Sequence, residues 1–529
     1  MTTKKFFKKL CLLGTMSFAL TSSLYAESLP KPNPYLSAPV YGLTHFDPAQ
    51  TDSVPYAVKS GTYNIDLNKL KNVNGGPVNI ITLASTSQNY MWGVSSQGVS
   101  YIDISNGNFK EAARLDAPGI KVITPEVHKQ VLGKKYKTAK EVEDAVANIY
   151  GLGTTRIFNG IYSVVDNNNV VYADYVDGSD PVIYAFALKD SSNPSKGIEI
   201  IGTLNLKNVL KQGETLAGVS LTYDGKLIIV GNRSISVTDR SLKGELQTVR
   251  FGDDEYISNS VAVDEKNGIY VASDKYMRKV VWTGTKLSTD EKDGAWASLY
   301  DTGIEPPTVK VGKGTGSTPT LMGFGNDEDK LVVITDGANR MNLVAFWRDN
   351  IPANFKQKPG TKSNRIADQI KVTAGLPEST EFVQTEQSVV VKDYGAFVVN
   401  NIGQPGPKDK LAGVIALGPV TTPPVGAERF EWDTKTDSWK SVWTRNDVSS
   451  TSMVPAVSTK SNIVFVNGYS AKAGWEVTGM DWNTGKTVHR TVFGYNNYGN
   501  GAYAIIQFFP NGDMLFNSIA GPFRIKYTK

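Results

Sequence analysis

The sequence predicts an all-β fold, a seven- or eight-bladed β-propeller with a small helical insertion. Three observations support it: a strand pattern that recurs along the chain, tight-turn residues between the strands, and an ordinary globular composition. The 529 residues include 49 glycines and 25 prolines, and 40% are hydrophobic and 20% charged. Such a composition indicates many turns and excludes a wholly disordered, collagenous or coiled-coil chain.

The recurring unit is an apolar run, a tight turn, a β-branched run, and then Asn or Asp followed by small or polar residues. In 218–239, Asp224-Gly225 supplies the turn and Asn232 ends the second run. Asp-Gly and Asn-Gly between β-rich runs predict hairpins because the favoured turn needs positive φ at both central residues. The copies are 161–178, 218–239, 260–282, 319–347, 388–403, 455–470 and 503–521, and 89–105 contains the later two strands of another copy. A spacing of ~40–65 residues fits propeller blades with insertions.

Closure of the ring has two interpretations. The final copy stops after 522–529, one strand short of a four-stranded blade. The β-rich segment 77–84 could supply the missing strand, so that the first and last elements share one sheet and no edge is left open. The alternative is a three-stranded last blade, and the sequence does not choose between them.

Residues 1–26 have the features of a cleavable signal peptide: a basic start, an apolar run from Leu10 to Leu20, and small residues near Ala26. The apolar run is shorter than the ~20 residues that span a bilayer. Cys11, the only cysteine, lies in this segment, so the mature chain would have no thiol, disulfide or thiolate metal site. Removing the four lysines among the first nine residues lowers the formal net charge from +5 to +1, which argues against nucleic-acid binding. We expect a periplasmic or secreted protein with no integral membrane segment.

The rest of the chain divides into an extended Pro-rich leader, 27–55, and the propeller, 56–529. A helical insertion is expected at 124–149, where Thr138 to Glu141 has the form of a capping box. It could cover one mouth as a lid, but packing on the rim is the favoured interpretation. Its lysines are predicted to form a solvated face; they are Lys134, Lys135, Lys137 and Lys140.

The known catalytic motifs are missing from the sequence. His45, His128 and His489 are scattered without metal-ligand spacing, which argues against a histidine-rich zinc or copper centre. There is no Gly-x-Ser-x-Gly elbow and no Gly-x-x-x-x-Gly-Lys-Ser/Thr loop. A nearby carboxylate could orient the imidazole of His45, but a surface or turn histidine in the leader is the favoured interpretation.

The best candidate site is the Asn or Asp that ends the second run of each copy. Equivalent strand ends of a closed ring lie on one face at similar radius, so these side chains would form a girdle around one entrance. Its members are Asp174, Asn232, Asp274, Asp336, Asn401, Asn467 and Asn517, and Asn339 and Arg340 extend it beyond Asp336. Oxygen ligands suit Ca²⁺, and Asp336 and Asn401 are the expected metal ligands. The favoured alternative is local turn chemistry, because Asn and Asp bond nearby backbone and tolerate left-handed conformations.

Gly479-Met480-Asp481-Trp482-Asn483-Thr484-Gly485-Lys486-Thr487 resembles the repeat of propellers of the pyrroloquinoline-quinone (PQQ) type, and 101–107 is similar but weaker. The chain thus resembles exported bacterial quinoprotein-like β-propellers, many of them functionally uncharacterised. The resemblance implies a quinone-dependent dehydrogenase. Alcohol dehydrogenases of that family carry a vicinal disulfide near the cofactor and regularly spaced Trp docking motifs, which this chain lacks. The resemblance therefore supports the fold rather than the activity.

We expect a small molecule to bind in the axial funnel, with Ca²⁺ or, less favoured, PQQ as cofactor. One alternative is a lactonase- or esterase-like hydrolase, since related propellers use a funnel calcium to polarise a carbonyl or phosphoryl group. The other is a non-catalytic scaffold for protein partners. Exposed-looking aromatics could form a partner surface, although blade packing is the favoured role; they are Trp432, Trp439, Trp443, Tyr495 and Tyr498.

Overall fold

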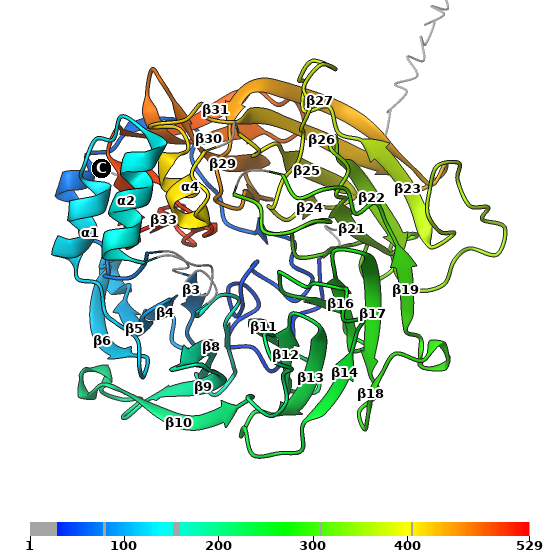
Figure 1. Ribbon diagram of the computed structural model, residues 1–529, viewed down its shortest axis with the longest axis horizontal. Coiled ribbons are helices and arrows are strands. Elements are labelled where there is room, and N and C mark those ends of the chain that lie inside the picture. Colours follow the sequence, from blue (N-terminus) through cyan, green and yellow to red (C-terminus); the bar gives the residue numbers. More distant parts are fainter. Residues whose placement is uncertain (1–28, 78–80, 152–158, 307–308, 404–405, 528–529) are drawn as a thin grey trace, which may run out of the picture.

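The computed structural model describes residues 29–77, 81–151, 159–306, 309–403 and 406–527. The strands in these ranges form eight sheets arranged around a central axis (Figure 1). Seven of these sheets have four or more strands, and the eighth has three. The predicted all-β propeller with a small helical insertion is confirmed, while the predicted signal peptide lies outside the described residues.

We number the sheets as blades 1 to 8 in chain order, and within each blade the strands follow one another from the axis outward (Figure 1). Blade 1 contains β3 (Ile81–Ala84), β4 (Tyr90–Ser95), β5 (Gly98–Asp103) and β6 (Lys110–Asp116). Blade 2 contains β7 (Val164–Val165), β8 (Val171–Asp177), β9 (Asp180–Leu188) and β10 (Ile198–Asn205). Blade 3 contains β11 (Leu216–Leu221), β12 (Lys226–Gly231), β13 (Ser234–Asp239) and β14 (Gln247–Arg250). Blade 4 contains β15 (Ala262–Val263), β16 (Gly268–Ala272), β17 (Tyr276–Trp282), β18 (Leu287–Ser288) and β19 (Trp296–Leu299), which also pairs with β17.

The second half of the ring repeats this arrangement. Blade 5 contains β20 (Thr320–Met322), β21 (Leu331–Thr335), β22 (Asn342–Trp347) and β23 (Ile366–Lys371). Blade 6 contains β24 (Val390–Lys392), β25 (Gly395–Val399), β26 (Val425–Asp433) and β27 (Ser438–Ser449). Blade 7 contains β28 (Ala456–Ser458), β29 (Ile463–Ser470), β30 (Gly474–Asp481) and β31 (Thr487–Gly494), and blade 8 contains β32 (Ile506–Phe508), β33 (Met514–Ser518) and β34 (Gly521–Ile525).

The turns and the core follow from the sequence pattern. Gly225, in the predicted Asp-Gly turn between β11 and β12, has φ +85°, and a Cβ there would lie 2.6 Å from the Tyr35 ring. The core lies between neighbouring blades; for example, Val230 and Val237 of blade 3 share a cluster with Val263 and Val271 of blade 4. Each fully buried valine of this kind contributes on the order of 1.5–3 kcal/mol. Radial packing therefore buries both faces of every small sheet.

The closure of the ring contradicts one of the two interpretations and agrees with the other. β3, within the segment 77–84, pairs with β4 and belongs to blade 1, so the idea that this segment completes the last blade is wrong. Blade 8 keeps three strands, which was the alternative. The chain ahead of β3 crosses blades 7 and 8 instead: β1 (Ser53–Val54) pairs in parallel with β28, and β2 (Gly61–Asn64) with β31. The amides of Val73 and Gly75 then donate to the carbonyls of Pro522 and Ala520 beside β34.

Residues 33–54, within the Pro-rich leader, form a plug at the centre of the ring (Figure 1). The plug is hydrogen-bonded to the innermost strand of every blade. The bonds, in blade order, are Ala84 N to Tyr41 O, Val165 N to Gly42 O, Asn33 Nδ2 to Leu221 O, Val263 N to Pro48 O, Leu321 N to Ala49 O, Val391 N to Thr51 O, Val457 N to Asp52 O and Phe508 N to Tyr41 Oη. These contacts satisfy inner-strand groups that would otherwise face the channel.

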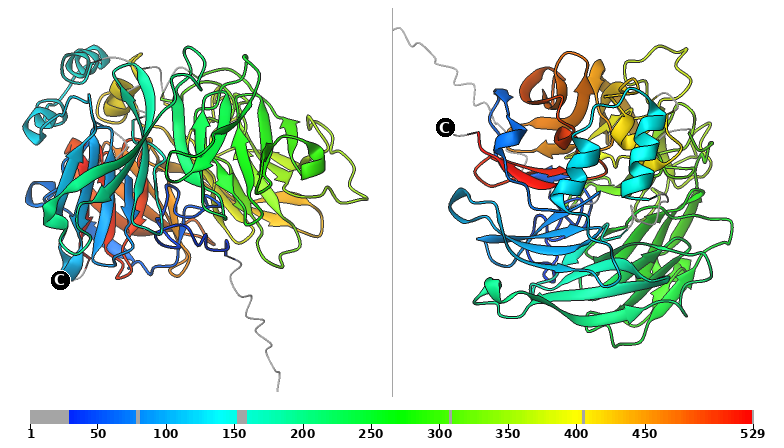
Figure 2. Two further views of the ribbon diagram at one scale, coloured as in Figure 1. Left: turned by 90° about the horizontal axis from the view of Figure 1, so that it is seen from below. Right: turned by 60° about the vertical axis from the view of Figure 1, so that its left-hand side comes forward.

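The α-helices of the described residues project from the face opposite the plug (Figure 2); they are α1 (Pro125–Leu132), α2 (Ala139–Ile149) and α4 (Lys410–Ala416). The predicted cap is present, since the Thr138 hydroxyl accepts the Glu141 amide proton at 3.3 Å. Apolar residues of all three helices pack together with Ala502 and Ile519 of blade 8. The insertion therefore lies over one side of the ring, as the rim interpretation predicted. Within the described ranges, no helix is long and apolar enough to cross a bilayer.

Candidate functional site

A cavity of about 60 Å³, which we call the funnel cavity, lies among the loops on the same side of the ring as the helices. Its lining residues come from the loops that lead into the innermost strands. Six different blades contribute polar or small residues, in chain order Tyr162, Asn259, Gly316, Glu386, Ser452 and Tyr503. Closure of the ring thus brings together residues that lie more than 300 positions apart in the chain.

Glu386 is the acidic residue that lines this cavity. Its Oε1 accepts a hydrogen bond from Asn401 Nδ2 at 3.1 Å, whereas its buried Oε2 has no partner among the described residues. Burial raises the pKa of Glu386 to about 7, although the Asn401 hydrogen bond and the charges of Lys410 and Lys310 lower it. Near neutral pH the carboxyl group is therefore divided between its protonated and ionised forms, and it can donate or accept a hydrogen bond.

The plug supports the cavity from below. Tyr162, which has φ +50°, donates its hydroxyl proton to Asn259 Oδ1, and its ring stacks on His45 at 5.7 Å. Burial raises the pKa of Tyr162, so it stays a neutral hydroxyl. His45 is only 1% exposed and its Nδ1 lies 2.9 Å from Asp52 Oδ2. His45 does occupy a turn, with φ +59°, but the expectation of a surface position is wrong because the plug buries it.

A buried lysine lies behind the cavity wall. Lys310 donates to the Gly314 carbonyl at 2.5 Å and to Gln384 Oε1 at 3.2 Å, and burial lowers its pKa to about 8. Gly316 separates this side chain from the cavity. With φ +63° and a hypothetical Cβ 2.7 Å from Lys310 Cε, position 316 requires glycine.

Most of the predicted girdle residues lie at or just after the ends of second strands, whereas Asp174 and Asn467 lie inside β8 and β29. Asn232 accepts from the Thr215 amide and donates to the Ile257 carbonyl, both at 2.8 Å. It thereby joins the loop entering its own blade to the loop entering the next. Asn401 does the same, accepting from the Glu386 amide and donating to Thr451 O. Asn467 and Asn517 make equivalent bonds to the loops around blade 8 and to blade 1.

The acidic members of the girdle are similarly placed. Asp336 accepts from the amides of Ala338 and Asn342 and from Asn342 Nδ2, and burial raises its pKa to about 6. Asp274 accepts from the Tyr256 amide at 2.9 Å. Burial raises the pKa of Asp174, and its Oδ1 has no partner in the described part of the chain. Only the bonds of Asp336 lie within a few residues along the chain, which is the kind of contact that the alternative interpretation describes.

The girdle does not converge on the funnel cavity. None of the nine predicted residues lines it, and only Asn401 reaches it, through Glu386. Arg340 donates to the carbonyls of Pro377 and Thr380 at 2.9 Å, and Asn339 is exposed. Across the described ranges, no group of three or more His, Cys, Asp or Glu side chains is placed to hold a metal ion. Calcium binding by Asp336 and Asn401 stays a prediction.

Glu386 was not among the predicted site residues, because that prediction considered only the residues that end the second run of each copy. The residues nearest the axis instead precede the first run, as in the polar stretch 384–388 before β24. Polar residues at this position in several copies, including Tyr162, Asn259 and Ser452, are the signal that could have identified the cavity.

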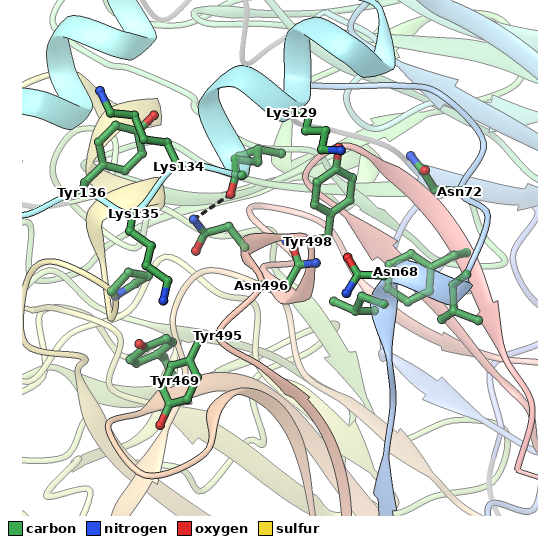
Figure 3. Close-up of a pocket in the computed structure, with 17 residues that line it drawn as sticks. Asn68, Asn72, Lys129, Lys134, Lys135, Tyr136, Tyr469, Tyr495, Asn496 and Tyr498 are labelled. Carbon is green, nitrogen blue, oxygen red and sulfur yellow. Dashed lines mark hydrogen bonds between the residues drawn. The ribbon is translucent and has the colours of Figure 1, made fainter.

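A second and larger cavity, of about 720 Å³, lies beneath the helices at the side of the ring (Figure 3). It is lined partly by residues expected only to be solvated or packed, namely Lys134, Lys135, Tyr495 and Tyr498. The lysines are exposed, as predicted. Of the other aromatics, Trp432 and Trp439 pack edge to face at 5.2 Å, which confirms the packing role for that pair.

No protein-family model matches the chain. A relative, an uncharacterized protein of Archaeoglobus fulgidus, is 34% identical over 356 residues, which are 65% of this chain. The aligned region is 66% of the relative, so this chain covers slightly less than two thirds of that protein's length.

The solved structures similar to this chain include quinoprotein dehydrogenases. A quinohemoprotein alcohol dehydrogenase from Pseudomonas putida HK5 matches with a TM-score of 0.49 at 12% identity, covering 90% of this chain and 75% of that one. The enzyme of the same name from Comamonas testosteroni gives 0.47 at 12% identity, with 90% and 76% covered. A putative 6-phosphogluconolactonase from Bacteroides fragilis gives 0.40 at 10% identity, with 77% and 91% covered. Likenesses this distant carry no argument about activity.

Proposed function

We propose that this propeller binds a small hydroxylated molecule, or the hydroxyl-bearing end of a larger one, at the bottom of its axial funnel. The observation that carries the proposal is the unpartnered, buried Oε2 of Glu386 at the cavity. A buried carboxylate oxygen without a partner costs free energy, which a hydroxyl donor would recover.

The surrounding groups support a neutral hydroxylated ligand. The Ser452 hydroxyl already accepts from the Tyr503 amide at 3.3 Å, so its own proton is available to an oxygen acceptor. Glu386 can match either role because its pKa lies near 7. The cavity of about 60 Å³ corresponds to roughly two water molecules at ~30 Å³ each, so only one end of a sugar-sized ligand would enter it.

The described residues do not fit PQQ at this position. Sites for drug-sized molecules are ~300–1,000 Å³, and the cavity of about 60 Å³ leaves no room for a tricyclic quinone. For calcium, the described residues place no group of three or more His, Cys, Asp or Glu side chains around Asp336. We therefore derive no step through either group.

The proposal is tested by thermal unfolding of the purified protein with glycerol, erythritol or glucose, compared between the wild type and Glu386→Gln. Binding at 100 times the dissociation constant would stabilise the wild type by ~2.7 kcal/mol. Non-specific solute effects would act equally on both proteins, so the difference between them is the measurement. Glu378→Gln, an exposed carboxylate on a loop away from the cavity, is the matched control.

The wild type and the control should be stabilised more than Glu386→Gln by at least one of these probes. Equal shifts in all three proteins would overturn the proposal and favour the scaffold alternative. Parallel melts with CaCl₂ and with chelator, for the wild type and Asp336→Asn, test the calcium prediction separately.

A further inference from the structure

The cavity beneath the helices, which we call the cap pocket, lies between the C-terminal end of α1 and the outer parts of blades 7 and 8 (Figure 3). Its volume of about 720 Å³ is within the ~300–1,000 Å³ typical of small-molecule sites. Its walls come from the helical insertion, β29, the chain between blades 7 and 8, residues 67–72 near η1 (Leu67–Lys69), Pro419 after α4 and Phe523 of β34. The cap pocket and the funnel cavity have no lining residue in common.

Hydrogen bonds fix the shape of the cap pocket. Asn497, at the start of the short helix η5 (Asn497–Gly499), donates to the Leu132 carbonyl at the end of α1 at 3.0 Å. The same side chain accepts from Trp475 Nε1 at 3.2 Å. The Tyr136 hydroxyl donates to the Val131 carbonyl at 2.7 Å and holds the following loop. A pocket with walls fixed in this way loses little conformational entropy when a ligand binds.

The cap pocket is positively charged. Lys129 and Lys135 extend into it, and Lys135 points toward the rings of Tyr469 and Tyr495 (Figure 3). Neither lysine has an ion-pair partner in the described part of the chain, and none of the lining residues is acidic. Glu126, whose charge acts on Tyr498, lies outside the lining. The pocket therefore offers two uncompensated ammonium groups to an anion.

Aromatic and amide groups complete the lining. Tyr495 is 56% exposed, and its hydroxyl donates to the Ala471 and Lys472 carbonyls at 2.8 and 3.1 Å, which fixes the ring. Tyr469 contacts this ring edge to face at 6.4 Å. Asn496 accepts from the Tyr498 amide at 3.0 Å through Oδ1, so its Nδ2 can donate to a ligand. Aromatic faces suit the C–H face of a sugar, and amides suit its hydroxyls.

We infer that the cap pocket binds an acidic saccharide, a short chain of sugars that carry carboxylate groups. Separate lysines around an aromatic floor match single negative charges distributed along such a chain. A nucleotide, the other common ligand with a ring and negative charge, is disfavoured. The lining contains no arginine for bidentate phosphate contacts.

The experiment uses isothermal titration calorimetry of the full-length protein with tetragalacturonate, and with cellotetraose and ATP as the neutral and nucleotide probes. Tetragalacturonate should bind and cellotetraose should bind at least ~10-fold more weakly. Raising NaCl to ~0.5 M should weaken the acidic probe, because salt screens exposed charges. Tighter binding of ATP than of tetragalacturonate would overturn the inference.

The variants separate the cap pocket from other basic surface. Lys129→Gln with Lys135→Gln should reduce tetragalacturonate affinity by at least ~10-fold, and Tyr495→Ala should reduce it severalfold. Lys137→Gln, an exposed lysine of the same insertion outside the lining, is the matched control and should leave affinity unchanged. All four positions are exposed, so folding should be retained, which circular dichroism checks. Equal affinity in the wild type and the double variant would also overturn the inference.

Discussion

The two ends of the central channel are built in opposite ways. At one end, the plug hydrogen-bonds to the innermost strand of all eight blades, and its residues 41–52 are all buried. At the other end, loops from six blades leave a small cavity that contains a carboxylate oxygen of Glu386 without a partner among the described residues. One face of the ring is thus filled by the chain itself, and the other is where we propose that a ligand binds.

Of the changes that test this comparison, deletion of the plug should lower the stability of the protein most. A chain without residues 29–52 loses the buried side chains of that segment and its bonds to the blades, and overall stability is only ~5–15 kcal/mol for a typical domain. We therefore expect no folded protein, as judged by near-ultraviolet circular dichroism and gel filtration. A compact, cooperatively unfolding deletion variant would show that the ring is stable without its centre.

A single substitution inside the plug should have the next largest effect. His45→Ala removes the partner of Asp52, whose side chain is completely buried, and breaking a buried pair typically costs ~3–5 kcal/mol. Urea unfolding measures the change in the free energy of unfolding. On the helical face, Lys140→Ala removes the exposed Lys140–Asp144 pair and should leave the free energy of unfolding close to the wild-type value. Similar losses for both variants would contradict the contrast between the two ends.

The smallest expected effect is at the funnel end and depends on pH. The pKa of folded Glu386 is raised from 4.5 to about 7, so the folded state holds this proton more tightly than the unfolded state. The stability of the wild type relative to Glu386→Gln is therefore greatest below pH 4.5 and is lost as pH rises toward 7, by up to about 3 kcal/mol. Urea unfolding of both proteins at pH 5 and pH 8 measures it. A difference that stays constant across this range would show that Glu386 is not perturbed.

The sequence predicted those features that depend on residues only a few positions apart in the chain. Asp224-Gly225, the β-branched runs and the Thr138 cap act over a few residues, so the blades, hairpins and helical insertion could be predicted. The ring closure could not be settled, because 77–84 has the same composition whether it pairs with β4 or with blade 8. The bonds of Asn232 and Asn401 could not be predicted from a local pattern, because they reach the Ile257 and Thr451 carbonyls in the loops that enter the next blade.

The plug and the candidate site escaped prediction for a different reason. A Pro-rich segment without apolar periodicity gives no sign that eight inner strands will surround it, and His45 therefore looked exposed. Glu386 lies near the axis because its loop leads into an innermost strand. The distance of that loop from the axis is set by the closure of the ring and is not encoded in the local sequence. The cap pocket likewise depends on α1 meeting the chain between blades 7 and 8 through Asn497.

The plug also has a consequence for the order of assembly. The Tyr41 hydroxyl donates to the Phe508 carbonyl, 467 positions later in the chain. This hydrogen bond cannot form until almost the whole chain has been synthesised. Closing so long a separation is entropically costly, and proteins dominated by such contacts fold slowly. Blades 1 to 7 can form as the chain lengthens, but their shared centre is completed only when blade 8 exists. The full set of hydrogen bonds between the plug and the ring can therefore form only after nearly the whole chain has been made.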